Sequence, residues 1–165
     1  MMSQTLSHPD TITSLPHHLL TTLTLEVDFP ATVVIGTTPH GHRGIARVAG
    51  GHFAGERLSG SVRPGHDWYV VRADGTLEID VRLTLATDDG AAIYLSYQGN
   101  MRAAPEVMAR FRKGERLAPE DYALQVVATM ECGDARYGWL NDLLVVGIGE
   151  QMPGGVIYRL FEIGA

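Results

Sequence analysis

The residues best suited to chemistry lie within the alternating stretch Thr76–Thr87. Asp80 and Arg82 stand two positions apart there, and aliphatic residues occupy the alternate positions. A guanidinium binds a carboxylate, enolate or phenolate oxygen through its planar set of donors, and a neighbouring carboxylate can orient that ligand or move a proton. The pair could therefore serve a cyclase, isomerase or lyase that works by proton transfer.

The direction of this strand face decides whether the pair can act. Successive side chains on a strand point to opposite faces, so Asp80 and Arg82 share one face and the aliphatic residues occupy the other. The polar face of an antiparallel strand usually meets water. An inward face would instead place both groups in an enclosed chamber, where a carboxylate requires a cationic partner. The spacing leaves both orientations open.

His66 and Asp67 are two further candidates for acid or base chemistry. They follow the turn-forming pair Pro64-Gly65, at the entrance of an expected strand. A side chain at the rim of a barrel could act as a general base near neutral pH. The competing interpretation is an exposed loop histidine beside an aspartate that caps a turn.

Six more residues could form the wall of a binding pocket. Aromatic side chains suit a planar ligand, as concave sites often do, although they pack equally well in a core. A glutamate and an asparagine could add polar groups, although an asparagine at the start of a strand can instead bond to backbone. These ligand-binding candidates are Trp68, Tyr97, Glu131, Tyr137, Trp139 and Asn141.

Metal and cofactor chemistry find little support in the residue pattern. His40 and His42 bracket a glycine in a turn-like stretch without a nearby acid, so we expect no metal site. Cys132 is the single cysteine and has no evident activating histidine. Gly147 and Gly149 lack the third glycine of a dinucleotide fingerprint. We therefore expect no cofactor.

The elements that must position these residues are short strands separated by glycine-containing turns. A single short helix is expected after Pro105, ending at Gly114, with a further helical turn near Pro119. Roughly nine or ten strands with one helix indicate a barrel or sandwich. The predicted strands are Leu19–Val27, Ala31–Thr37, Gly44–Phe53, Glu56–Val62, Asp67–Arg72, Thr76–Thr87, Ala91–Gln98, Tyr122–Met130, Leu140–Ile148 and Gly155–Ile163.

A set of short motifs is spread over most of the chain. They are Asp67-Trp68, Asp74-Gly75, Asp80-Val81-Arg82, Asp89-Gly90 and Trp139-Leu140-Asn141, set among spaced glycines. With this combination the chain resembles the family known as "domain of unknown function 3237". The resemblance implies an all-β fold, a single closed antiparallel β-barrel of allene-oxide-cyclase or lipocalin-like shape with one short helix. It assigns no general activity.

The resemblance also bears on the candidate site. Asp80 and Arg82 fall on motif positions whereas Glu78 and Thr84 do not, which favours an inward pair. This chain departs from the family pattern at His66, where a glycine is usual. A second departure is Gln125, where the family tends to have an arginine, so the ligand could differ from that of its relatives.

Length and charge limit the remaining possibilities. A chain of 165 residues can bury one core, so we expect a flexible arm over residues 1–14 and one barrel domain over residues 15–165. A net charge of −6 with a single lysine, Lys113, argues against nucleic acid as a partner. Without a secretory signal or a stretch that could span a membrane, a cytoplasmic location is expected.

These observations lead to one main hypothesis and two alternatives. The main hypothesis is a barrel that binds a small hydrophobic or aromatic, oxygenated molecule and performs cofactor-free proton transfer, with Asp67 and Asp80 as acid and base and Arg82 as anion stabiliser. The first alternative is a non-catalytic binding protein of the same shape. The second is a barrel that mainly builds a homo-oligomer, which is also the expected assembly.

Overall fold

The strands of the protein follow one another around a ring. The computed structural model describes residues 14–164, so the predicted arm over residues 1–14 lies, apart from Ser14, outside the described residues. The strands are β1 (His17–Thr38), β2 (Gly41–Ala54), β3 (Gly60–Val62), β4 (Gly65–Asp67), β5 (Val70–Val71), β6 (Leu77–Thr87), β7 (Ala92–Ala103), β8 (Tyr122–Cys132), β9 (Leu144–Met152) and β10 (Gly155–Ile163).

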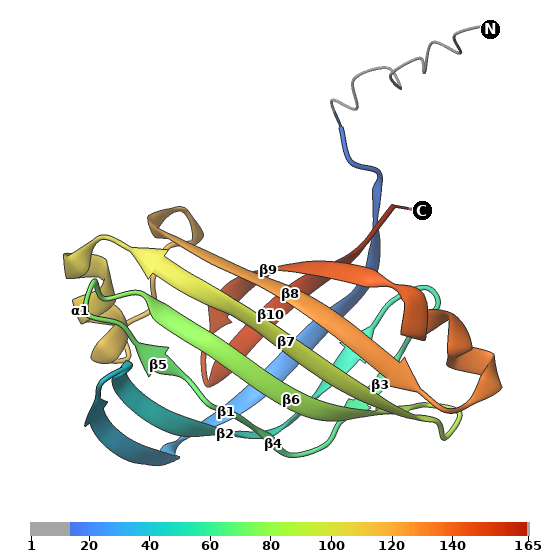
Figure 1. The fold of residues 1–165 in the computed structure, drawn as a ribbon, viewed down its shortest axis with the longest axis horizontal. Helices are drawn as coiled ribbons and strands as arrows, with labels where there is room; N and C mark the ends of the chain where they lie inside the picture. Colours follow the sequence, from blue (N-terminus) through green and yellow to red (C-terminus); the bar gives the residue numbers. More distant parts are fainter. Residues whose placement is uncertain (1–13, 165) are drawn as a thin grey trace, which may run out of the picture.

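Closure of the ring depends on β1, which pairs with both β10 and β2 (Figure 1). All pairings are antiparallel, and β3, β4 and β5 together fill the single place between β2 and β6. The result is a barrel-like ring of 8 strands. A barrel of this size can hold one small ligand, and the predicted all-β closed barrel is confirmed.

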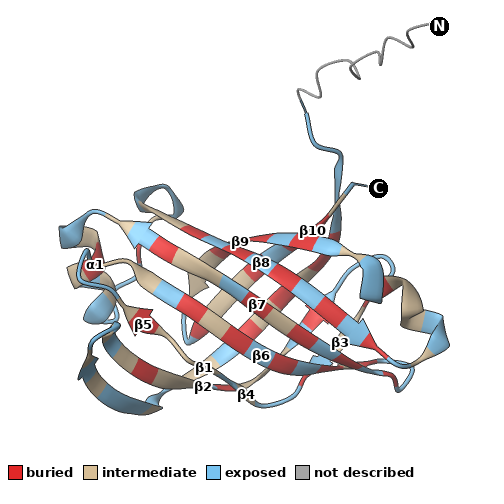
Figure 2. Cartoon of the chain, in the orientation of Figure 1, coloured by how far each residue is buried: buried red, intermediate tan, exposed pale blue. Residues whose placement is uncertain are grey.

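Strand β6 shows which face of the sheet the barrel buries (Figure 2). Ile79, Val81 and Leu83 are buried, whereas Arg82 is exposed and Asp80 is partly exposed on the other face. Burial of each aliphatic side chain contributes roughly 1.5–3 kcal/mol, and leaving the two charges outside avoids their desolvation. The inward orientation of Asp80 and Arg82 is therefore wrong.

The interior is divided along the barrel axis. At the end that carries β3, side chains such as Phe53, Leu85 and Ile93 are at most 1% exposed and fill the barrel completely. Toward the other end, marked by the helix α1 (Pro105–Arg112), the inward residues of β6 border a cavity instead. The helix predicted after Pro105 is confirmed, and Gly114 follows it with a φ of 76°.

The predicted strands Glu56–Val62 and Asp67–Arg72 are replaced by the three short strands β3, β4 and β5, and two further features differ from the prediction. The stretches Leu19–Val27 and Ala31–Thr37 belong to the one long strand β1, because the chain passes Asp28–Val33 as an irregularity in pairing and not as a turn. The strand predicted to start at Leu140 starts at Leu144 instead. Residues before it form the 3₁₀ segment η2 (Ala135–Asp142), which Asp134 caps by accepting the backbone N–H of Arg136.

The connection between β7 and β8 contains α1 and a second short helical element. The 3₁₀ turn η1 (Pro119–Asp121) joins the segment after α1 to β8, at the position where a helical turn was expected. Among the described residues, no helix is both long enough and apolar enough to cross a bilayer.

Candidate functional site

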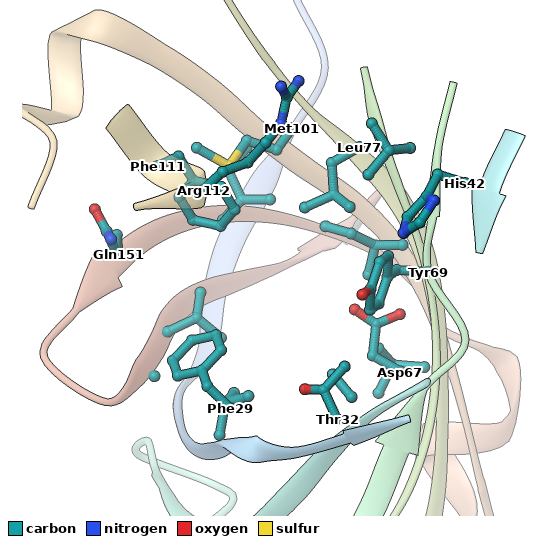
Figure 3. Close-up of a pocket in the computed structure, with 18 of the residues that line it drawn as sticks. Phe29, Thr32, His42, Asp67, Tyr69, Leu77, Met101, Phe111, Arg112 and Gln151 are labelled. Atoms are coloured by element: carbon teal, nitrogen blue, oxygen red, sulfur yellow. The ribbon is translucent and has the colours of Figure 1, made fainter. Parts of the chain in front are cut away.

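A cavity of about 1390 Å³ opens at the α1 end of the barrel (Figure 3). Its wall is mostly aliphatic and aromatic and comes from β1, β2, β6, β7 and β10, with α1 and the β9–β10 turn at the mouth. A concave apolar space with few polar groups is the usual form of a small-molecule site. The volume is large enough for a ligand of drug size or more.

Asp67 is the one acidic residue among the described residues that line this cavity. It ends β4, where strand alternation turns His66 outward and Asp67 inward. Burial raises the pKa of Asp67 to about 6. The backbone N–H of Asp80, which donates to Asp67 Oδ1 at 3.0 Å, acts in the opposite direction and lowers the pKa. The nearby charge of Asp80 raises the pKa by a smaller amount. A carboxyl with this pKa can donate or accept a proton near neutral pH.

Four tyrosines among the described residues line this cavity, and Tyr69, Tyr97 and Tyr158 are the three on which the charge of Asp67 acts. Tyr97 on β7 and Tyr158 on β10 are both 3% exposed, and their ring centroids lie 5.3 Å apart. Burial raises the pKa of both, and hydrogen bonding to Tyr158 raises that of Tyr97 further. Burial, followed by the charge of Asp67, raises the pKa of Tyr69 as well. All three phenols are therefore neutral hydrogen-bond donors at physiological pH.

The position of Tyr69 depends on Gly44 in the neighbouring strand β2. A Cβ atom on Gly44 would lie 2.2 Å from the Tyr69 hydroxyl oxygen, so only glycine leaves room for the ring in this position. Figure 3 shows the Tyr69 hydroxyl and the Asp67 carboxyl in the same part of the cavity. The sequence indicated this arrangement only indirectly, because Tyr69 follows Asp67 by two residues and so shares its strand face.

The other catalytic candidates form a cluster on the outer face of the barrel. His66 pairs across strands with Arg82, whose guanidinium carbon lies 5.3 Å from the Trp68 ring centroid. Asp80 makes an ion pair with Arg82 at 3.3 Å. The structure therefore places the candidates His66, Asp80, Arg82 and Trp68 together on the outer face of the barrel, and only Asp67 of the catalytic candidates in the cavity.

Four of the ligand-binding candidates lie at the opposite, filled end of the barrel. Asn141 holds the end of β8, accepting the Cys132 N–H at 2.8 Å and donating to its carbonyl at 3.1 Å. Trp139 lies beneath the Arg57 guanidinium, and Tyr137 donates to Asp89. Glu131 is exposed on β8. The structure therefore brings only Tyr97 of the predicted ligand-binding set together with Asp67.

Metal ligands do not gather in the described part of the chain. Residues 14–164 contain no group of three or more histidine, cysteine or acidic side chains that could hold an ion. His40 and His42 instead lie at the mouth of the cavity. The arrangement in the cavity is thus a carboxyl group with neutral phenols in apolar surroundings.

The fold and the cavity define a small β-barrel protein with one ligand-sized interior site. The chain belongs to the family described as "Protein of unknown function (DUF3237)", which matches residues 17–163. A UPF0311 protein of Clostridium acetobutylicum is 29% identical over 143 residues, covering 86% of this chain and 89% of the relative. The family resemblance seen in the sequence is confirmed.

Solved structures share the same barrel. A protein of unknown function from Rhodopseudomonas palustris has a TM-score of 0.84 at 26% identity, covering 92% of this chain and 98% of that one. A β-barrel-like protein from Acinetobacter baumannii has a TM-score of 0.81 at 29% identity, covering 96% and 99%. An enzyme from Penicillium herquei has a TM-score of 0.70 at 19% identity, covering 95% and 100%, and shares the fold alone.

Proposed function

We propose that this barrel binds a hydrophobic, oxygenated small molecule and transfers a proton on it through Asp67. The observation that supports the proposal is a single carboxyl with its pKa raised to about 6, placed inside a largely apolar cavity of ligand size. Perturbed carboxyls in concave sites are typical of catalytic acids and bases. A solved protein of the same fold is an enzyme, which adds support for catalysis in a barrel of this shape.

The chemistry needs only groups that the chain itself supplies. In its carboxylate form Asp67 removes a proton from an acidic C–H or O–H of the ligand, and the carboxylic acid so formed returns the proton to another atom. Neutral phenols such as Tyr69 can donate hydrogen bonds to an oxygen on which negative charge develops. Isomerisation, ring closure and elimination all fit this sequence of steps without a cofactor.

A ligand screen on the full chain tests the proposal. We expect some aromatic or terpenoid acids, alcohols or ketones to raise the melting temperature, because a ligand at one hundred times its Kd stabilises the folded state by about 2.7 kcal/mol. Ligands that bind are then incubated in deuterated water, and wild-type protein is expected to accelerate their deuterium uptake or rearrangement. A panel in which no compound shifts the melting temperature would contradict the proposal.

A non-catalytic binding protein is the second candidate function. This function is favoured because Asp80 and Arg82 lie outside the barrel. Among the described residues, Asp67 therefore has no second charged group beside it inside the cavity. The same experiment separates the two functions, because a carrier releases its ligand unchanged and without deuterium uptake. The expected cytoplasmic location remains a prediction.

We also propose that two copies of the chain associate through an apolar patch on the outside of the barrel. The patch consists of Val127 on β8 and Leu144, Val146 and Ile148 on β9, which are between 38% and 67% exposed. Val127 pairs directly with Val146, so the side chains are contiguous. A second copy is the partner that fits, because a patch along one strand is self-complementary about a two-fold axis.

The patch gives a direct prediction for assembly. Ile148→Glu is expected to convert a wild-type dimer to a monomer, because each copy then brings a buried charge into an apolar contact. Sedimentation equilibrium measures the change. Thr84→Glu on the exposed face of β6, two strands away from β8, is the matched control and is expected to leave the dimer intact. A wild-type chain that sediments as a monomer would overturn this proposal.

A further inference from the structure

The mouth of the cavity is rich in cationic side chains. Arg112, Lys113 and Arg116 line it from the end of α1 and the segment that follows, and Arg72 lines it from the loop after β5. The chain as a whole has a net charge of −6. A local concentration of positive charge at the entrance of an apolar cavity, in an acidic protein, attracts and holds anions.

Pairing leaves only part of this charge free. Arg72 is neutralised by Asp74 and Glu78, and Arg110, on the same helix as Arg112, pairs with Glu115. Arg112, Lys113 and Arg116, by contrast, have no carboxylate within 4.0 Å among residues 14–164. Three of the four arginine and lysine side chains that border the cavity are therefore unpaired within residues 14–164.

We propose that the ligand is an amphipathic anion whose head group, a carboxylate or a phosphate, is bound at the mouth by Arg112 and Arg116. The inference rests on the proposed function, because it takes the barrel interior as the site of the apolar tail. A guanidinium binds either head group through two parallel hydrogen bonds. The exposed position of both arginines leaves room for a hydrophilic head at the water boundary.

The strand register gives the length of the ligand. Asp67 pairs with Val81, whereas Leu77 pairs with Val71 at the rim. Arg112 reaches this rim, since its Nη2 atom lies 3.9 Å from the position a Cβ atom would have on Gly75. The level of Asp67 in the barrel and the rim are therefore four residues apart on β6, from Val81 to Leu77, which is about 13 Å along the strand.

This separation defines the substrate class more closely. An anion held at the rim cannot also be the group that exchanges a proton with Asp67. Because barrel strands are tilted to the axis, the ligand carries its reactive carbon or oxygen on an extended apolar chain or ring system on the order of 10 Å from the charged end. Farnesoic acid, farnesyl phosphate and farnesol form a probe set that shares one apolar tail and differs only in the head group.

The experiment compares the affinities of these three probes for two matched double variants. In the wild type, we expect both anions to bind about tenfold more tightly than farnesol at low salt, and the preference to shrink at high salt. Arg112→Gln/Arg116→Gln is expected to remove the preference without changing farnesol binding. Arg63→Gln/Arg102→Gln removes the same charge from two exposed arginines outside the cavity lining and is expected to retain the preference.

Each outcome has a separate meaning. Equal affinity of the wild type for all three probes would overturn the anion inference and leave the proposed cavity function standing. If both double variants lose the preference for anions equally, the anion inference is also overturned. The overall charge of the protein, and not Arg112 and Arg116 at the mouth, would then attract the anions. Failure of all three probes to bind would count against the proposed function itself, and the inference would fall with it. The stronger-binding anion identifies the head group.

Discussion

Asp67→Asn is expected to make the barrel more stable at neutral pH and to abolish proton transfer. Burial raises the pKa of Asp67 from its ordinary value of 3.8 to about 6, so the folded state disfavours the ionised carboxylate. That shift corresponds to about 3 kcal/mol at neutral pH. Asparagine carries no charge and can still accept the Asp80 N–H, so it removes the cost of the charge and retains the hydrogen bond.

The pH dependence of stability follows from the direction of the shift. Because the folded pKa of Asp67 is raised, its contribution to stability is fully present below pH 3.8 and is lost as the pH rises through about 6. Wild type and Asp67→Asn should therefore have similar free energies of unfolding at acidic pH and diverge across this window. Urea denaturation over a pH series measures the difference.

A control variant separates this effect from a general change of charge. Asp142→Asn removes a carboxylate from an exposed position, and its stability should follow the wild type at every pH. If the free energy of unfolding of Asp67→Asn differs from that of the wild type by the same amount at every pH, the carboxyl of Asp67 is not held in its neutral form. Turnover of any ligand found in the screen should be lost in Asp67→Asn and retained in Asp142→Asn.

Ala46→Trp is expected to block the cavity and weaken ligand binding about hundredfold, equivalent to about 3 kcal/mol. Ala46 lies on β2 directly opposite Asp67 and lines the cavity, so an indole at this position occupies the space that the ligand tail needs. The loss corresponds to roughly 110 Å² of apolar ligand surface that can no longer be buried. Titration calorimetry with a ligand from the screen measures the affinity.

The matched control for this variant lies on the same strand. Ala54 is exposed at the far end of β2, and Ala54→Trp should leave affinity unchanged. The folded state of Ala46→Trp is checked by its melting temperature, because the cavity offers room for the added ring without displacing the core. Unchanged affinity in a folded Ala46→Trp protein would place the ligand somewhere other than this cavity.

The residue pattern by itself determined an all-β fold whose strands each carry one apolar face, and the family resemblance added that the sheet closes into a barrel. The alternation of Ile79, Val81 and Leu83 with polar residues requires a half-buried strand, and the hydrophobic effect dictates which face is buried. The usual exposure of a polar strand face favoured an outward Asp80 and Arg82, whereas the family motif gave weight to the inward orientation, so the sequence left both open. In the structure, Asp80 and Arg82 belong to the cluster on the outer face, where the Arg82 guanidinium lies over the Trp68 indole ring. A structural role in this cluster also explains why both residues fall on motif positions.

Only the tertiary structure decided which residues meet. Asp67, Tyr97 and Tyr158 come from β4, β7 and β10, and closure of the ring brings these distant segments around one cavity. Strand periodicity assigns a side chain to a face but not to a depth along the barrel, so it could not separate Tyr97 in the cavity from Trp139 at the filled end. Shape and depth arise from pairing register, which depends on contacts between residues far apart in the chain.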